Sequence, residues 1–247
     1  MRISRFYIEA SLQPEQVIDL PAHLVNYIVN VLRLKKGAEI VLFNADNNIE
    51  GEFTAQLIDA SKRHVSVCIL GFTATKTEPL IAVHLYQGIS KGDKMDFTIQ
   101  KSIELGITSI TPVFTQRSNA GKLDDKRLGK KILHWQGVAI SACEQSGRTQ
   151  LVKINQPITV KQITAQNKSI SLILAPDAAT SLKDLPQETP KNVNIFIGPE
   201  GGLNAEEIAW AKERGYLELR LGQRILRTET AGLAILSVMQ FLWGDFS

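Results

Sequence analysis

Short apolar runs separated by polar turns dominate residues 1–72, and this pattern is typical of β-strands. The clearest run is residues 64–69, where apolar and polar side chains alternate as in a half-buried strand. One amphipathic segment, which begins at Pro21 and ends at Lys36-Gly37, predicts a helix. The pattern therefore predicts a small barrel with one helix. The apolar face of the helix comprises Leu24, Tyr27, Ile28, Val31 and Leu32, and the strands are expected at residues 5–10, 39–44, 51–57 and 64–70.

After residue 79 the pattern changes to apolar strands that alternate with amphipathic helices. This alternation predicts an α/β domain with a mainly parallel sheet and helices on both faces. Residues 71–79 are polar and rich in turn residues, so we expect a linker there and divide the chain into domains of residues 1–72 and 73–247. Strands are expected at residues 81–87, 107–114, 171–175, 193–197 and 218–221, and helices at 93–105, 124–145 and 232–243, with a further helix between Asn204 and Gly215.

The composition adds limits rather than a function. The chain is 44% hydrophobic and 21% charged, which is ordinary for a globular protein, and its net charge is only +3. Two cysteines, Cys68 and Cys143, lie without CxxC spacing, so neither a disulfide framework nor a zinc site is expected. Charged residues within the first 20 positions argue against a secretory signal, and residues 231–243 are too short to span a bilayer. We expect a cytoplasmic protein without a metal or a membrane segment.

A glycine loop, Gly198-Pro199-Glu200-Gly201-Gly202, joins an expected strand to an expected helix. Open α/β sheets bind ligands at such strand-to-helix loops, although the loop could also be a tight turn that holds nothing. Asn204 and Glu207 have the spacing of a capping box, and Gly215 would end the helix. The carboxylate of Glu200 would repel a pyrophosphate, and neither GxGxxG nor GxxxxGK[ST] occurs, which disfavours a nicotinamide dehydrogenase. A ligand with cationic groups and a ribose, such as S-adenosylmethionine, suits the loop better.

A second loop has the same setting, because residues 218–231 (ELRLGQRILRTETA) also run from a strand through Gly222 into a helix. Ile225 and Leu226 could flank an adenine that the loop backbone binds, or they could be core residues. Thr228 and Thr230 are expected to cap the following helix.

Four sequence blocks carry a resemblance to a known family. They are HLVNYIVNVLRLKKG (23–37), KGDKMDFTIQKSIELGITSITPVFTQRS (91–118), ACEQSGR (142–148) and IGPEGGLN (197–204) with LGQRILRTETA (221–231). In this order they resemble the RsmE group of SPOUT methyltransferases across most of the chain. One departure is the absence of a proline shortly after Arg148, which leaves the shape of that loop open.

The resemblance implies an N-terminal PUA-like barrel that binds RNA and a C-terminal SPOUT domain with a deep trefoil knot. It also implies a homodimer that uses S-adenosylmethionine to methylate the ring imide nitrogen of a uridine in small-subunit ribosomal RNA. A knotted ribose 2′-O-methyltransferase and a non-enzymatic RNA-binding assembly factor are the alternatives. The residues expected to bind the cofactor are Leu174, Ala175, Ile197, Gly198, Pro199, Glu200, Gly201, Gly202, Leu221, Gly222, Ile225, Leu226, Thr230 and Ala231.

The catalytic candidates are charged residues in two places. Arg227 and Glu229 lie beside the second loop, and Glu144 and Arg148 lie at the end of the long helix. An arginine could stabilise a uridine anion and a glutamate could accept its proton. Arg227 could instead fix the loop by pairing with Glu229 or Glu200. Glu144 and Arg148 could instead cap the helix end or form a surface pair.

Clusters of basic residues are the candidates for phosphate contact. The candidates are Arg2, Arg5, Arg33, Lys35, Lys36, Lys91, Lys94 and Arg117.

Overall fold

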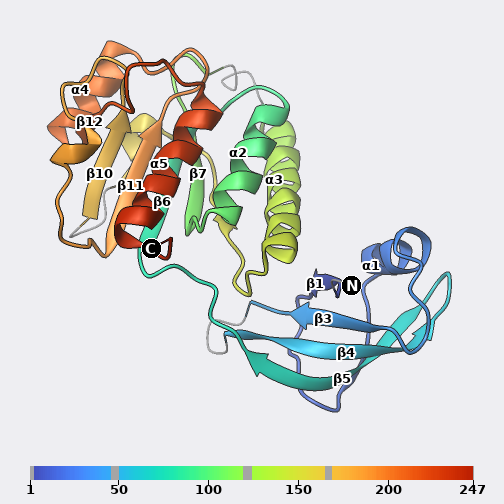
Figure 1. Ribbon diagram of the computed structural model, residues 1–247. Helices are drawn as coiled ribbons and strands as arrows, with labels where there is room; N and C mark the ends of the chain where they lie inside the picture. The colour runs from blue at the N-terminus through green and yellow to red at the C-terminus, as the bar shows by residue number, and fades with distance from the viewer. Residues whose placement is uncertain (1–2, 46–49, 119–123, 165–168, 247) are drawn as a thin grey trace. The chain divides into compact units, whose positions relative to one another are not determined.

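The computed structural model describes residues 3–45, 50–118, 124–164 and 169–246, and the chain forms two compact units (Figure 1). The first unit contains Met1–Glu78 and Cys143–Leu151, and the second contains Pro79–Ala142 and Val152–Ser247. The expected linker is shorter than its composition suggests, because the last strand of the first unit stays paired through Ala74. The domain boundary at residue 72 stays a prediction.

The first unit is built on a five-stranded sheet of order β1-β3-β4-β5-β2. β1 pairs in parallel with β3, and the other neighbours are antiparallel. Register shifts between β4 and β5 are β-bulges, which bend a strand pair and let it curve around a core. The strands are β1 (Arg5–Tyr7), β2 (Val17–Asp19), β3 (Glu39–Phe43), β4 (Gly51–Ala60) and β5 (Val65–Ala74).

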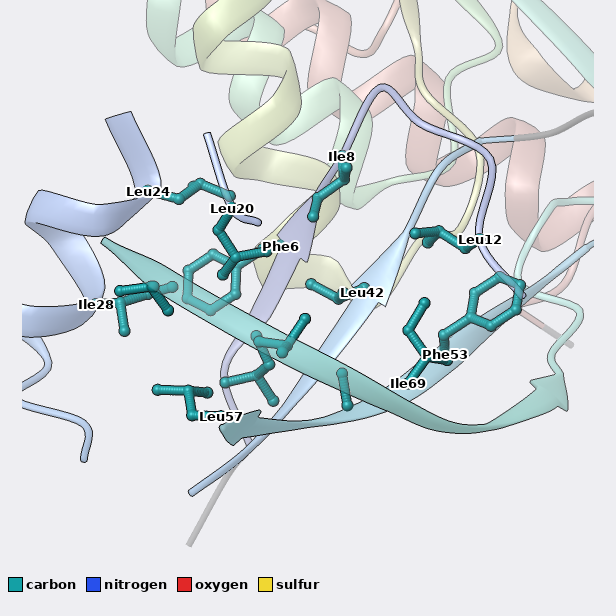
Figure 2. Close-up of a cluster of buried hydrophobic side chains, with 14 of the residues drawn as sticks. Phe6, Ile8, Leu12, Leu20, Leu24, Ile28, Leu42, Phe53, Leu57 and Ile69 are labelled. Carbon is teal, nitrogen blue, oxygen red and sulfur yellow. The ribbon is translucent and has the colours of Figure 1, made fainter. Parts of the chain in front are cut away.

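Apolar side chains from β1, β3, β4 and β5 form the core of this unit (Figure 2), and Ile18 of β2 packs against it. Val65, Val67 and Ile69 are fully buried at alternate positions of β5, which confirms the predicted half-buried strand. β2 was not predicted, because it is only three residues long and its outer residues are exposed.

The predicted helix forms, but its buried face differs from the expected one. It consists of α1 (Ala22–Asn26) followed by a π-helical turn, η1 (Tyr27–Val31). The N–H of Leu32 donates to the carbonyl of Tyr27, five residues earlier, so each turn there takes up an extra residue. As a result Ile28 is buried, whereas Tyr27 and Val31 are 46% and 59% exposed. The helix also ends before Lys36-Gly37, because Arg33 already has a positive φ of 54°.

The second unit contains a parallel sheet of order β12-β10-β11-β6-β7-β8, with β9 also paired to β7. Every strand pair in it is parallel, which confirms the predicted sheet type. The strands are β6 (Ala82–Gly88), β7 (Ser109–Phe114), β8 (Lys153–Ile154), β9 (Ile158–Thr159), β10 (Ser169–Leu174), β11 (Asn192–Ile197) and β12 (Leu217–Leu219). The helices and 3₁₀ turns are α2 (Asp93–Glu104), α3 (Asp125–Ser146), η3 (Val160–Gln162), η4 (Leu182–Asp184), α4 (Ala205–Glu213) and α5 (Thr228–Trp243), and the end of α3 from Cys143 onward belongs to the first unit.

Helices cover both faces of this sheet, as predicted. Phe196 packs in a cluster with Ile208 and Trp210 of α4. The next residue, Ile197, points to the opposite face, and a Cβ added to Gly232 of α5 would lie 3.3 Å from its Cδ1. Figure 1 shows α5 crossing in front of the sheet, and α5 packs against α2. The layers therefore bring the carboxyl ends of the strands to one edge of the unit.

Two expectations for the second unit were wrong in detail. α5 begins at Thr228 rather than at residue 232, because Arg227 already has the extended backbone of an N-cap. β8 and β9 were not predicted, since two-residue strands give no periodic signal. In the part of the chain that the structure describes, no helix is long and apolar enough to cross a bilayer. The trefoil knot stays a prediction.

Candidate cofactor and active site

A cavity of about 580 Å³ lies at the carboxyl ends of three neighbouring strands, β10, β11 and β12. This volume is within the range of roughly 300–1,000 Å³ that is usual for small-molecule sites. Its wall is made mainly by the loops that follow these strands. The wall comprises Leu174–Ala178, residues 197–203, residues 218–222 and residues 224–229, together with Lys94, Arg117, Ile208 and Ala231.

The first glycine loop is held in one tight conformation. A Cβ on Gly198 would lie 2.8 Å from the backbone of Gly202 and Leu203, so only glycine fits there. Gly202 has a φ of 69°, and its N–H donates to the Pro199 carbonyl at 2.8 Å. Arg117 donates from Nη1 to the carbonyl of Gly201 at 2.8 Å. These contacts leave backbone groups of the loop along the cavity wall.

The helix after this loop begins as predicted. The Asn204 side chain accepts the N–H of Glu207 at 2.7 Å, and the Glu207 carboxylate accepts the N–H of Asn204 at 2.9 Å, which confirms the capping box. Gly215 follows α4 with a φ of 80°.

Glu200 is anchored by lysines rather than by an arginine. Its Oε1 accepts the backbone N–H of Lys91 at 3.1 Å and lies 3.3 Å from Nζ of Lys94. Burial opposes ionisation, but hydrogen bonds from the backbone of Glu200 and Lys91 and the Lys94 ammonium outweigh it and lower the pKa of this carboxyl. Glu200 is therefore an ionised carboxylate that pairs with Lys94. This pairing disfavours the alternative in which Arg227 fixes the loop by pairing with Glu200.

The second glycine loop brings apolar and charged residues to the same cavity. Ile225 is 84% exposed and lines the cavity with Leu226, so Ile225 is not a core residue. Neither predicted threonine caps α5, because its N-cap is Arg227 and no side chain caps it. Thr228 instead turns its hydroxyl into the interior, and Thr230 is the one predicted cofactor contact that does not line the cavity.

Glu229 and Arg227 are charged residues of this loop that form no ion pair among the described residues. Glu229 lines the cavity, and its Oε2 is buried without a hydrogen bond. An unsatisfied buried acceptor typically costs about 1–3 kcal/mol, so a ligand that donates or carries a positive charge fits there. Arg227 also lines the cavity and is exposed, and in the described part of the chain it forms no ion pair.

The other two catalytic candidates belong to the first unit. Burial raises the pKa of Glu144, whose Oε1 accepts the backbone N–H of Tyr7 at 3.1 Å. Arg148 is buried, and its guanidinium donates to both carboxylate oxygens of Glu78. These contacts favour structural roles, and a catalytic role for either residue stays a prediction.

The basic residues that were predicted to contact phosphate differ in their exposure and in their partners within the fold. Arg33, Lys35, Lys36 and Lys91 are exposed. Arg5 is largely buried, pairs with Glu52 at 2.9 Å and lies over the Phe43 ring, so its phosphate contact is disfavoured. Lys94 and Arg117 are engaged with the first glycine loop, and Arg2 lies outside the described residues.

Gln87 is a polar residue near this site that the sequence analysis missed. It lies at the end of β6 with a fully buried side chain, and Nε2 donates to Thr228 Oγ1 at 3.0 Å. The available signal was an amide at the end of an apolar strand, directly before a glycine.

Two models of known protein families match this chain. A family model described as the RNA methyltransferase domain matches residues 76–240, and one described as the RNA methyltransferase PUA domain matches residues 20–70. The two matches together assign the chain to the RNA methyltransferases that carry a PUA domain.

Individual relatives narrow the class. The ribosomal RNA small subunit methyltransferase E of Buchnera aphidicola (subsp. Schizaphis graminum) is 36% identical over 251 residues, which cover 100% of this chain and 99% of the relative. The enzyme of that name from Neisseria gonorrhoeae, solved with S-adenosylmethionine bound, is 37% identical with a TM-score of 0.90 and full coverage of both chains. A methyltransferase from Legionella pneumophila, solved with the same cofactor, is 38% identical with a TM-score of 0.94 and full coverage of both chains. The chain belongs to the family of ribosomal RNA small subunit methyltransferase E, which confirms the resemblance.

Proposed function

We propose that this enzyme transfers the methyl group of S-adenosylmethionine to the ring imide nitrogen of a specific uridine in small-subunit ribosomal RNA. The observation that carries the proposal is a cavity lined by both glycine loops in which, among the residues that the structure describes, Oε2 of Glu229 accepts no hydrogen bond and Arg227 forms no ion pair. The two solved relatives that hold this cofactor support it.

The cavity wall suits the cofactor chemically. S-adenosylmethionine carries an ammonium group and ribose hydroxyls, which can donate a hydrogen bond to Oε2 of Glu229, and a sulfonium, whose positive charge attracts the carboxylate. The exposed side chain of Ile225, with Leu226, offers an apolar surface for the adenine. The glycines of the loop that begins at Gly198 carry no side chain, so a ligand can approach the backbone there closely.

When bound, the cofactor supplies an electrophilic methyl group on a positively charged sulfur. The chain must hold the imide nitrogen in line with the carbon–sulfur bond, so that the nitrogen–carbon bond forms as the electron pair moves to sulfur. The imide proton must also leave. Arg227 stabilises the negative charge that develops on the uridine ring, and Glu229 accepts the proton.

RNA docking belongs to the first domain in this proposal. Arg33, Lys35 and Lys36 are exposed and follow the π-helical turn within four residues of each other, which suits contact with a phosphate backbone. The barrel supplies affinity in this scheme, and the second domain supplies the chemistry.

We further propose that the enzyme is a cytoplasmic homodimer. Phe241 and Leu242 near the end of α5 are 63% and 44% exposed, and Phe246 beyond it is 49% exposed. Large apolar side chains grouped at one helix end suit an interface with a second copy.

Nucleoside mass spectrometry of ribosomal RNA from a strain without this protein tests the product. Loss of one methylated uridine, restored by adding back the wild-type gene, is expected, and the fragmentation pattern must place the methyl on the base. A methyl on the ribose would support the 2′-O-methyltransferase instead, and unchanged RNA would contradict any methyltransferase role.

Calorimetry with S-adenosylmethionine tests the cavity. We expect one molecule per protomer without added metal, and loss of binding in Gly198→Ala, since the new Cβ would lie 2.8 Å from the loop backbone. Gly137→Ala in α3 is the matched control, because a Cβ there meets nothing within 4 Å. Normal affinity in Gly198→Ala would show that the cofactor lies elsewhere.

A further inference from the structure

A buried polar cluster joins three segments that border the cofactor cavity. The hydroxyl of Thr228, the first residue of α5, donates to the carbonyl of Gly198 at 2.6 Å. Nε2 of Gln87, at the end of β6, lies 3.0 Å from Thr228 Oγ1, 3.0 Å from the Gly88 carbonyl and 3.4 Å from the Gly198 carbonyl. We call Gln87, Thr228 and the Gly198 carbonyl the clasp. It ties the start of the first glycine loop to the end of the second.

The side chains of the clasp are buried at the edge of the cavity, and the backbone around them is tightly packed. Gln87 is 0% exposed and Thr228 is 8% exposed. A Cβ on Gly88 would lie 2.6 Å from Pro199, so β6 and the first glycine loop approach as closely as backbones can. Because burial strengthens hydrogen bonds, the bonds of the clasp are expected to hold the two loops firmly in place.

Stability alone gives a poor reason for Gln87. Its Oε1 is buried without a hydrogen bond to any residue that the structure describes, which is a cost to folding. An apolar residue would fill the same space without that cost. The donor side of the amide must therefore supply something that an apolar side chain lacks, namely a fixed link between the two loops.

The position of Thr228 in the chain gives the link its consequence. Thr228 stands between Arg227 and Glu229, both of which line the cavity, and its partner Gly198 opens the loop that faces the cofactor. We infer that Gln87 and Thr228 are positioning residues, which hold Arg227 and Glu229 in register with the bound cofactor. This inference rests on the proposed roles of Arg227 and Glu229.

Thr228→Val tests the clasp, because valine keeps the shape of threonine and loses the hydroxyl. We expect the rate of total methyl transfer to small ribosomal subunits at saturating cofactor to fall about tenfold to a hundredfold, as misplacement by about 1 Å can do. Cofactor affinity by calorimetry should change less than about threefold, on the same reasoning that orientation and not binding is lost. Thr228→Ser keeps the hydroxyl and should recover most of the rate.

Thr111→Val is the matched control. Thr111 is also a buried threonine of the second unit, it accepts a 2.8 Å hydrogen bond from Asn155, and it does not line the cavity. Its variant should lose stability without losing rate. The double variant Gln87→Met/Thr228→Val should be no slower than the slower single variant, since both remove one link.

Three results would overturn the inference: a normal rate in folded Thr228→Val, a loss of affinity in proportion to rate, or no recovery in Thr228→Ser. Counting total methyl transfer keeps this test apart from the proposed function. If the wild-type product carried its methyl on another atom, the uridine proposal would fail while the ratio between variant and wild type still reported on the clasp.

Discussion

Arg227 is the residue on which the proposed chemistry depends most. It is the N-cap of α5, so its backbone is fixed by the helix while its side chain remains exposed at the cavity. Glu200, one of its two conceivable partners, is paired with Lys94, and the other, Glu229, forms no ion pair with it in the described part of the chain. A guanidinium in this setting can respond to charge that forms on a substrate.

We therefore expect Arg227→Ala to lose turnover rather than cofactor affinity. Removing one donor to a developing anion typically costs about 2.7–4 kcal/mol of activation free energy, or roughly a hundredfold to a thousandfold in kcat. Arg227→Lys keeps the charge and should recover part of the rate. Single-turnover kinetics and calorimetry on both variants measure the two effects, and a parallel loss of cofactor affinity would assign Arg227 to the loop structure instead.

At the scale of elements, the segment that follows the π-helical turn of the first unit combines strain with exposed charge. Arg33 has a φ of 54°, a backbone conformation that costs an L-residue roughly 1–2 kcal/mol. The N–H of Leu34 donates to the Ile28 carbonyl at 3.0 Å across it, so the chain reversal holds this conformation in place. Strain of this kind often marks functional positions, which fits the proposed phosphate contact.

Arg33→Gly should separate stability from function. We expect the free energy of unfolding to rise by about 0.5–1 kcal/mol, because glycine adopts a positive φ without strain but loses more backbone entropy on folding. RNA affinity should fall, with a slope against salt that is smaller by about one. Lys35→Gly is the control, because Lys35 lacks a positive φ and its variant should lose stability as well as affinity. A less stable Arg33→Gly variant would contradict the strain.

A histidine that is hydrogen-bonded to two aspartates in the same unit makes its stability depend on pH. His64 bridges two strands, with Nδ1 3.0 Å from Asp59 of β4 and Nε2 2.9 Å from Asp19 of β2. The hydrogen bond to Asp59, followed by the one to Asp19, raises the pKa of His64. The hydrogen bond to His64 lowers the pKa of Asp59, and the positive charge of Lys36 lowers it further. The protonated histidine therefore stabilises the link.

The sign of the pH dependence follows from these shifts. The histidine contribution is complete below about pH 6.5, its unfolded pKa, and is lost as the pH rises through its raised folded pKa. The Asp59 contribution is lost as the pH falls through its lowered folded pKa. Thermal unfolding should thus show a small decrease in Tm above about pH 6.5 that His64→Gln abolishes. An equal decrease in the variant would assign the effect to other groups.

Elements with a long periodic pattern were predictable from the sequence, and short or irregular ones were not. α2, α3 and β11 lie within two residues of their predicted bounds, because each buries a regular stripe or run. The π-helical turn was not foreseeable, since its extra residue per turn changes which side chains are buried without changing the composition. Thr228 shows the same limit at the site: its position suggested a cap, whereas its hydroxyl bonds to Gly198, thirty residues earlier in the chain.

At the scale of the whole molecule, the charge pattern predicted less than the loops did. The net charge of +3 gives no general attraction to RNA, so recognition has to depend on where the basic residues are placed. Several basic residues that were predicted to contact phosphate are instead bound to other groups of the fold, as the ion pair between Arg5 and Glu52 shows. The two glycine loops, by contrast, reach one cavity because parallel strands place their carboxyl ends at one edge of a sheet.

The oligomeric state is also a property of the whole molecule, and it depends on exposed apolar side chains of α5 and α2. Phe241 is 63% exposed near the end of α5, and Phe97 on α2, the helix that packs against α5, is 45% exposed. Isolated apolar residues are common on surfaces, but large side chains on two packed helices suit an interface. Phe241→Glu should therefore convert a dimer into a monomer of 27.3 kDa, because burying an unpaired carboxylate is unfavourable. Leu217→Glu, at a position that is 45% exposed on the edge strand β12, should leave the dimer intact. Sedimentation velocity at micromolar concentration measures both, and a wild-type monomer there would end the proposal of a homodimer.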